Sequence, residues 1–185
     1  MIKKEILIGV FILVLMLVVG WLWVTPGGLS TAPVISFKTS KGRDIHLQEL
    51  RGQPVLITFW ATTCPGCIKE MPHLISLYDE LSGAGLEIIG VAMHYDPPNQ
   101  VIELINQQQV SYPIVLDVDG SIAKAFDNVM LTPTSFLISP EGKIIKHKIG
   151  EMDMDKLEHQ IKSLLSQQLK AESFKSKVTA NESDT

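Results

Sequence analysis

Two cysteines, Cys64 and Cys67, are the residues of this chain best suited to chemistry, and they are its only cysteines. Residues 55–60, just before them, are apolar and rich in β-strand formers, whereas the residues after them have the apolar spacing of a helix. The pair is therefore expected between a buried strand and the first turn of a helix. Free backbone N–H groups and the helix dipole stabilise an anion there, and the thiolate is the reactive form of cysteine. The pattern predicts thiol–disulfide exchange at this pair.

Two roles without exchange chemistry are also open to such a pair. A static disulfide across so short a loop would remove little entropy from the unfolded chain, so it would stabilise the fold only weakly. Half of a zinc site would need further ligands, and the sequence has no second cysteine pair and no closely spaced histidine pair. The predicted position between a strand and a helix favours exchange over both roles.

The N-terminal part of the chain has the composition of a membrane anchor. Residues 6–24 are almost purely apolar. As a helix that rises 1.5 Å per residue, this segment is long enough to cross a bilayer of about 30 Å. Lys3 and Lys4 precede this segment, so the positive-inside rule predicts a cytoplasmic N-terminus. We expect a single-pass anchor in the cytoplasmic membrane, with the rest of the chain facing the periplasm or the cell exterior, where disulfides form.

A cleaved signal peptide is the alternative for this segment. The apolar core of a secretory signal is shorter, about 7–15 residues, and ends at a site of small residues. Here the bulky residues Trp21, Leu22 and Trp23 occupy the end of the apolar segment. We therefore expect the anchor to remain uncleaved.

The remaining sequence alternates between strand and helix patterns. We expect a linker at residues 25–33, a folded domain at 34–169 and a disordered polar tail at 170–185. Strands that alternate with helices and end in a hairpin predict an α/β sandwich with a mixed central sheet. Strands are expected at residues 34–37, 44–47, 55–60, 86–92, 114–116, 134–138 and 143–149, and helices after Cys67, after Pro97 and over residues 121–126 and 153–169.

Other polar residues are expected to have ordinary structural roles. The net charge of −4 gives no reason to expect a nucleic-acid partner. His73 and His94 are interpreted as surface or strand-end residues rather than ligands. Asp117 and Asp119 are interpreted as turn residues rather than a cation site. We therefore expect neither a metal nor a cofactor.

Several motifs together resemble the thioredoxin family. Phe59-Trp60-Ala61 leading into Cys64-Pro65-Gly66-Cys67, followed by Pro72, resembles the thioredoxin active site. Thr132-Pro133-Thr134 before a strand resembles the thioredoxin cis-proline loop. Glu70-Met71-Pro72 and the extra helix and strand between about residues 96 and 117 resemble the TlpA/ResA branch, whose members are membrane-anchored and reduce disulfides outside the cytoplasm. The resemblance covers about residues 32–169 and implies a thioredoxin-like three-layer sandwich preceded by one transmembrane helix.

The resemblance also implies roles for the site residues. Cys64 would be the exposed nucleophile and Cys67 the buried resolving thiol. Pro133 would be a cis-proline beside the sulfurs that leaves backbone groups of Thr132 free to pair with a substrate strand. Glu70 would be the carboxylate that manages protons for the buried thiol. The implied catalytic residues are Cys64, Cys67, Glu70 and Pro133, and the implied substrate-binding residues are Thr63, Pro65, Gly66 and Thr132.

Two positions depart from the family pattern. Most relatives carry tryptophan directly before the first cysteine, where this chain has Thr63, so a flat apolar wall beside the sulfur is missing. Thioredoxin has a buried aspartate six residues before the first cysteine, where this chain has Thr58. The first departure leaves partner preference open, and the second makes Glu70 the expected carboxylate.

The expected function is that of a membrane-tethered disulfide reductase. Pro65 and Gly66 bring no cation to the cysteines, which favours a reductant over a strong oxidant. Clients would be apocytochrome c or other exported proteins, and a membrane electron donor would reduce the pair again. We expect a monomer. The alternatives are a peroxiredoxin, which would need a hydroxyl at Ala61, and a copper metallochaperone, whose cysteine spacing is wider.

Overall fold

The computed structural model describes residues 13–16 and 30–182 of the chain. The predicted anchor at residues 6–24 therefore lies outside the described residues, apart from 13–16, which are helical. Among the described helices, none combines the length and the apolar character that crossing a bilayer requires.

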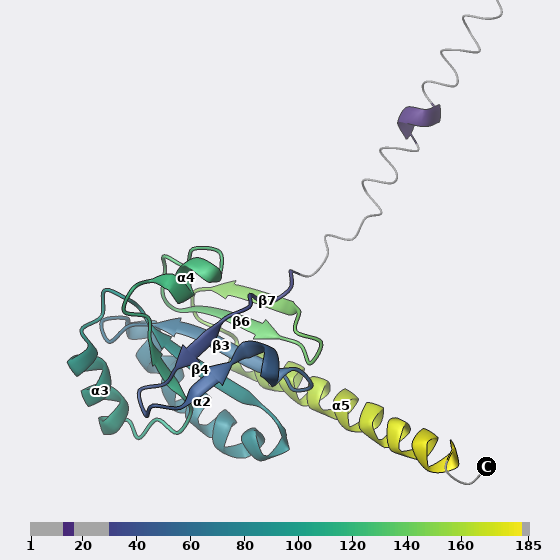
Figure 1. The fold of residues 1–185 in the computed structure, drawn as a ribbon. Coiled ribbons are helices and arrows are strands. Elements are labelled where there is room, and N and C mark those ends of the chain that lie inside the picture. Colours follow the sequence, from purple (N-terminus) through teal and green to yellow (C-terminus); the bar gives the residue numbers. More distant parts are fainter. Residues whose placement is uncertain (1–12, 17–29, 183–185) are drawn as a thin grey trace, which may run out of the picture.

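A mixed sheet forms the centre of the fold, as predicted. Within residues 30–182 its five strands lie in the order β5-β4-β3-β6-β7, so that β3 is central (Figure 1). Strands β3, β4 and β5 are parallel, whereas β6 is antiparallel to both β3 and β7. All six residues of β3 are buried, as is typical of a strand covered on both faces. The strands are β3 (Val55–Trp60), β4 (Glu87–Ala92), β5 (Ile114–Leu116), β6 (Thr134–Ile138) and β7 (Ile144–Ile149).

Helices and a hairpin cover the two faces of this sheet. Leu56 and Trp60 of β3 point into one apolar cluster, while Ile57 and Phe59 point into the other, because side chains alternate along a strand. The first cluster is closed by α2 (Pro65–Leu81), α3 (Pro98–Gln107) and α5 (Met154–Glu182). The second is closed by the antiparallel pair β1 (Ser36–Lys38) and β2 (Asp44–His46), by η1 (Leu47–Leu50) and by α4 (Ser121–Ala125).

Two elements of the structure extend beyond the boundaries expected from the sequence. Helix α5 continues to Glu182, although we expected disorder from residue 170 onward. Residues 154–182 contain no glycine or proline and are rich in lysine, glutamate and glutamine, so nothing in the sequence ends the helix at Leu169. The linker expected at residues 25–33 also ends early, because Ala32 N–H donates to Gly142 O at 3.0 Å and Ile144 N–H donates to Ser30 O at 2.8 Å.

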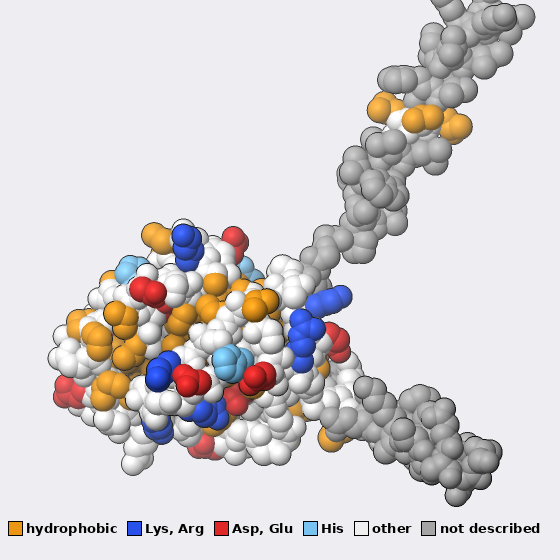
Figure 2. Space-filling model, viewed as in Figure 1, with side chains coloured by type: hydrophobic (Ala, Val, Ile, Leu, Met, Phe, Trp, Pro, Cys, Tyr) orange, Lys and Arg blue, Asp and Glu red, His pale blue; other side chains and the backbone are white. Residues whose placement is uncertain are grey.

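The surface of the described domain mixes both signs of charge. On the face seen in Figure 2, basic and acidic side chains are interspersed around an area of hydrophobic side chains. This distribution matches the small net charge of −4. An extended basic stripe, which nucleic-acid binding would favour, is not visible on that face.

Candidate active site

The cysteine pair lies where the sequence predicts, at the end of β3 and the start of α2. Cys64 is the N-cap of α2, and Pro65 follows at the first helical position, where its fixed φ suits a helix start. Cys64 and Cys67 form a disulfide with their Cα atoms 5.3 Å apart. The Cys67 N–H donates to Cys64 Sγ at 3.2 Å, so a free helical N–H does point at the first sulfur.

The exposure of the two sulfurs differs from the expectation. Cys64 was expected to be exposed, yet only 8 % of its surface is accessible, against 4 % for Cys67. Cys64 belongs to the same buried apolar cluster as Trp60 and Cys67. The neighbours Thr63 and Pro65 are exposed and Gly66 is half-buried, as residues that contact a client must be, and their substrate-binding role stays a prediction.

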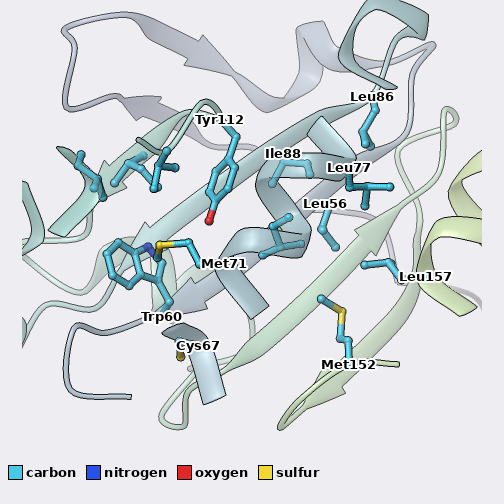
Figure 3. Packing of buried hydrophobic residues seen from close by; sticks show 14 of the residues in the cluster. Leu56, Trp60, Cys67, Met71, Leu77, Leu86, Ile88, Tyr112, Met152 and Leu157 are labelled. Carbon is cyan, nitrogen blue, oxygen red and sulfur yellow. The ribbon is translucent and has the colours of Figure 1, made fainter. Parts of the chain in front are cut away.

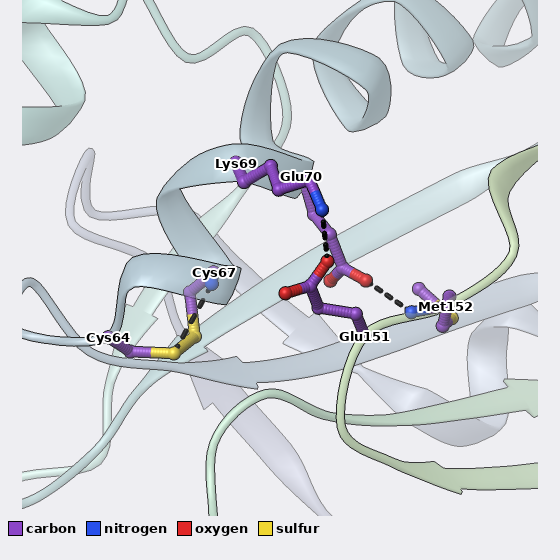
Figure 4. A network of polar contacts seen from close by, with 6 residues as sticks. All are labelled: Cys64, Cys67, Lys69, Glu70, Glu151 and Met152. Atoms are coloured by element: carbon purple, nitrogen blue, oxygen red, sulfur yellow. Dashed lines mark hydrogen bonds and ion pairs between the residues drawn. A yellow bond between two sulfur atoms is a disulfide. The ribbon is translucent and has the colours of Figure 1, made fainter.

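Glu70 is a buried carboxyl group one helical turn after Cys67. Only 4 % of its surface is accessible, so it is not a solvated helix residue. Its Oε1 accepts a hydrogen bond from the Met152 backbone N–H (Figure 4). Burial raises the pKa of Glu70, the bond from Met152 opposes that rise, and the nearby Glu151 carboxylate adds to it. A carboxyl group with a raised pKa next to a thiol can exchange protons with it closer to neutral pH.

An apolar wall lies behind the cysteines and Glu70. Trp60, Cys67 and Met71 belong to one cluster, and the Tyr112 side chain points toward Met71 in the same region (Figure 3). Burial raises the pKa of Tyr112, and the negative charge of Glu70 adds to that rise. Tyr112 therefore stays protonated. Thr58, at the position of the thioredoxin aspartate, receives a hydrogen bond from the Ser135 hydroxyl at 3.0 Å and does not supply a carboxylate.

The predicted cis-proline is present. The Thr132–Pro133 peptide bond is cis. Thr134 pairs with Phe59 across β6 and β3, which brings Pro133 level with Trp60 at the edge of the sheet where the cysteine segment begins. Pro133 is buried, Thr132 is half-buried and the preceding Leu131 is exposed. This order of exposure suits a loop that a client could approach from Leu131 and Thr132.

The loop after β7 connects the parts of the site, and the sequence did not predict this. The Gly150 N–H donates to Pro133 O at 2.8 Å, while the Met152 N–H donates to Glu70. Glu151, between them, accepts from Lys69 Nζ at 2.7 Å. Two of these contacts use backbone groups that every non-proline residue possesses, so residue types could not reveal them. The only local sign was Gly150 after the last strand, with φ of 86°.

Asp96 is a second residue whose contribution was not predicted. Its buried carboxylate accepts hydrogen bonds from the Thr62 N–H at 2.6 Å and from the Thr62 hydroxyl at 2.5 Å. Thr62 lies two residues before Cys64, so Asp96 fixes the turn that delivers the first cysteine.

The two histidines and two aspartates singled out in the sequence lie in ordinary structural positions. His73 and His94 are exposed. The Asp117 carboxylate accepts from the backbone N–H groups of Ile122 and Ala123, each at 2.9 Å, and thereby holds the start of α4. Asp119 accepts from the Ser121 N–H at 3.0 Å, which is turn chemistry.

Comparison with known proteins gives consistent matches. The sequence model of the AhpC/TSA family matches residues 30–147, a span that includes both cysteines, Glu70 and Pro133. Thiol-disulfide oxidoreductase ResA of Bacillus subtilis is 36% identical over 123 residues, which are 66% of this chain and 68% of that protein. Sporulation thiol-disulfide oxidoreductase A of the same organism is 34% identical over 126 residues, which are 67% of this chain and 75% of that protein.

Solved structures match over the same domain. The crystal structure of StoA from Bacillus subtilis matches with a TM-score of 0.60 and 33% identity, covering 70% of this chain and 97% of that one. The solution structure of a putative thioredoxin from Neisseria meningitidis matches with a TM-score of 0.68 and 31% identity, covering 73% and 90%. The α/β sandwich described above is therefore the thioredoxin fold.

Proposed function

Because the chain belongs to the AhpC/TSA family and is a thiol–disulfide oxidoreductase of the TlpA/ResA-like thioredoxin type, we propose that it reduces protein disulfides outside the cytoplasm while tethered to the membrane. The observation that carries the reductive direction is the buried Glu70, one turn after Cys67 on α2. A carboxylate one turn after Cys67 opposes a thiolate at Cys67, and a reduced form that is less stabilised gives up its electrons more readily.

The exchange proceeds in two displacements. In the reduced protein the Cys64 thiolate attacks one sulfur of the client disulfide, that S–S bond breaks, and the leaving client thiolate takes up a proton. Cys67 then loses its proton to Glu70 and attacks Cys64 Sγ, the mixed S–S bond breaks, the second client thiolate leaves and takes up a proton, and the Cys64–Cys67 disulfide closes. Two electrons pass to the client. The Cys67 N–H stabilises negative charge on Cys64 Sγ while that sulfur is a thiolate.

Disulfide reduction is tested directly with an insulin assay. The reduced protein is expected to precipitate insulin by cleaving its interchain disulfides, with dithiothreitol as the electron source. Titration with Cu(I) and consumption of hydrogen peroxide, measured on the same preparation, test the copper-chaperone and peroxidase alternatives. Tight Cu(I) binding or rapid peroxide reduction without insulin reduction would contradict the proposal. The peroxidase alternative is disfavoured at the residue level, because Ala61 is buried and has no hydroxyl group.

The membrane part of the proposal rests on residues 6–24 and on Lys3 and Lys4. We expect the purified full-length protein to retain its N-terminus, and a membrane-impermeant thiol reagent to label the reduced cysteines in intact cells or spheroplasts. A mature N-terminus near Thr31 would contradict the anchor. Labelling only after lysis would contradict the orientation.

The client is proposed to be apocytochrome c or another exported protein, and the electron donor a membrane protein. If the client or donor lies near the membrane, release of the domain lowers function in cells. The released form should begin at Ser30, because the Ser30 carbonyl accepts from the Ile144 N–H and belongs to the folded domain. Full function of that form at equal abundance would contradict a membrane-proximal partner.

A further inference from the structure

Glu151 lies directly over the cysteine motif. A Cβ atom added to Gly66 would lie 3.1 Å from Glu151 Cγ and 3.2 Å from Glu151 Oε1, so the Glu151 side chain covers Gly66, the second of the two residues between the cysteines. The other carboxylate oxygen, Oε2, accepts from Lys69 Nζ at 2.7 Å (Figure 4). Proton transfer from Cys67 uses Glu70, and the hydrogen bond to Glu70 comes from Met152. The Glu151 carboxylate therefore takes no proton in the exchange step, and its part there is limited to adding to the raised pKa of Glu70.

We propose that Glu151 is a specificity-determining residue, which favours client segments carrying lysine or arginine next to the cysteine that Cys64 attacks. The inference rests on the proposed function and names a class of client for it. A client segment that pairs at Thr132 and extends from Cys64 across Pro65 and Gly66 would pass the Glu151 carboxylate, because that side chain lies over Gly66. A cation beside the client cysteine meets an opposite charge there, and an acidic residue meets a like charge.

Lys69 does not cancel this preference. Its side chain is 74% exposed and that of Glu151 is 47% exposed, so their ion pair lies in water, where such pairs contribute little. A client cation can therefore take the place of Lys69 at small cost. Lys69 reaches the carboxylate from α2 at Oε2, whereas Oε1 is the oxygen held over Gly66. The Glu151 carboxylate is thus nearer to Gly66 than the ammonium group of Lys69 is.

The test compares two cyclic disulfide peptides that differ only in having lysine or glutamate beside one cysteine. Reduced protein is mixed with each peptide at low ionic strength, and the second-order rate constant is measured by acid quench and chromatography. Each constant is divided by that of the same peptide with 2-mercaptoethanol, a neutral thiol, which removes intrinsic differences between the peptides. For the wild type, the corrected rate constant of the lysine peptide is expected to exceed that of the glutamate peptide by about three- to ten-fold. This is the range expected when Glu151 attracts the lysine and repels the glutamate at an exposed site.

Glu151→Gln is expected to reduce the ratio of the lysine-peptide to the glutamate-peptide rate constant to below about two-fold. Lys69→Met is expected to raise this ratio, because Lys69 then no longer competes with the client cation for Glu151. High salt should compress the wild-type ratio. Glu103→Gln, on the exposed part of α3, is the matched control and should leave the ratio unchanged.

A wild-type ratio near one, or a ratio that Glu151→Gln leaves intact, overturns the inference while the proposed function stands. Equal changes in both rate constants overturn it as well, because Glu151 would then act on the cysteines and not on the client. If the wild type reduces neither peptide and no insulin, the proposed function fails and the inference fails with it.

Discussion

Cys64→Ser is expected to abolish disulfide reduction, with a loss of at least about 10³-fold, whereas Cys67→Ala is expected to stop the reaction at the mixed disulfide. The reason is position. Cys64 is the N-cap residue and its sulfur receives the Cys67 N–H, so its thiolate is stabilised. Cys67 lies inside the first turn and is the less accessible of the two. Attack on the client therefore starts at Cys64.

The measurement is trapping in cells that express Cys67→Ala, followed by non-reducing gels and mass spectrometry of the adducts. Adducts should join client cysteines to Cys64 and disappear on treatment with dithiothreitol. The double variant Cys64→Ser/Cys67→Ala is the matched control and should trap nothing. If iodoacetamide at mildly acidic pH modifies Cys67 of the reduced wild type faster than Cys64, the order of attack is the reverse of the one proposed.

The sequence was informative where residue type and local spacing decide the structure. The apolar residues of β3 and the helical spacing after Cys67 were enough to place the cysteine pair. Glu70 and the cis Thr132–Pro133 bond were predicted through family resemblance, and the structure shows the first buried and the second cis.

The contacts that complete the site were not predictable in the same way. Met152 reaches Glu70 across 82 positions of the sequence, and Gly150 reaches Pro133, both through backbone N–H groups. Asp96 was not singled out in the sequence, because its partner Thr62 comes from a different strand end. The contacts of Met152 and Gly150 depend on how β7 returns beside β6, and the contact of Asp96 depends on the pairing of β3 with β4. Both are properties of the fold and not of any short motif.

Glu70→Gln is expected to slow resolution of the mixed disulfide by about 10²-fold at neutral pH, the usual size of a proton-transfer contribution. Glutamine keeps the shape and an oxygen that can accept from the Met152 N–H. It cannot take the proton of Cys67. Because burial raises the pKa of Glu70, the wild-type rate should fall as pH decreases through that raised pKa, since only the ionised carboxylate accepts a proton. The variant should lack this acidic limb.

The raised pKa of Glu70 also makes the free energy of unfolding depend on pH, in a direction that can be predicted. A carboxyl group whose pKa is higher in the folded than in the unfolded protein favours folding fully below its unfolded value of about 4.5, and this contribution is lost as pH rises through the folded pKa. The free energy of unfolding of the oxidised wild type should therefore decrease, relative to Glu70→Gln, as pH rises from about 4 through the folded pKa. Urea unfolding at several pH values measures this difference. Glu103→Gln, which removes an exposed carboxyl group, should show no such trend.

The two readouts together separate chemistry from packing. A residue that only fills space would change unfolding but leave the pH–rate profile alone, because no proton would pass through it. We expect both to change: the acidic limb of the resolution rate disappears, and the pH dependence of the wild-type stability relative to Glu70→Gln follows the raised pKa. Identical resolution kinetics of wild type and Glu70→Gln from pH 5 to pH 9 would remove Glu70 from the mechanism. The proton of Cys67 would then leave directly to water when the mixed disulfide is resolved.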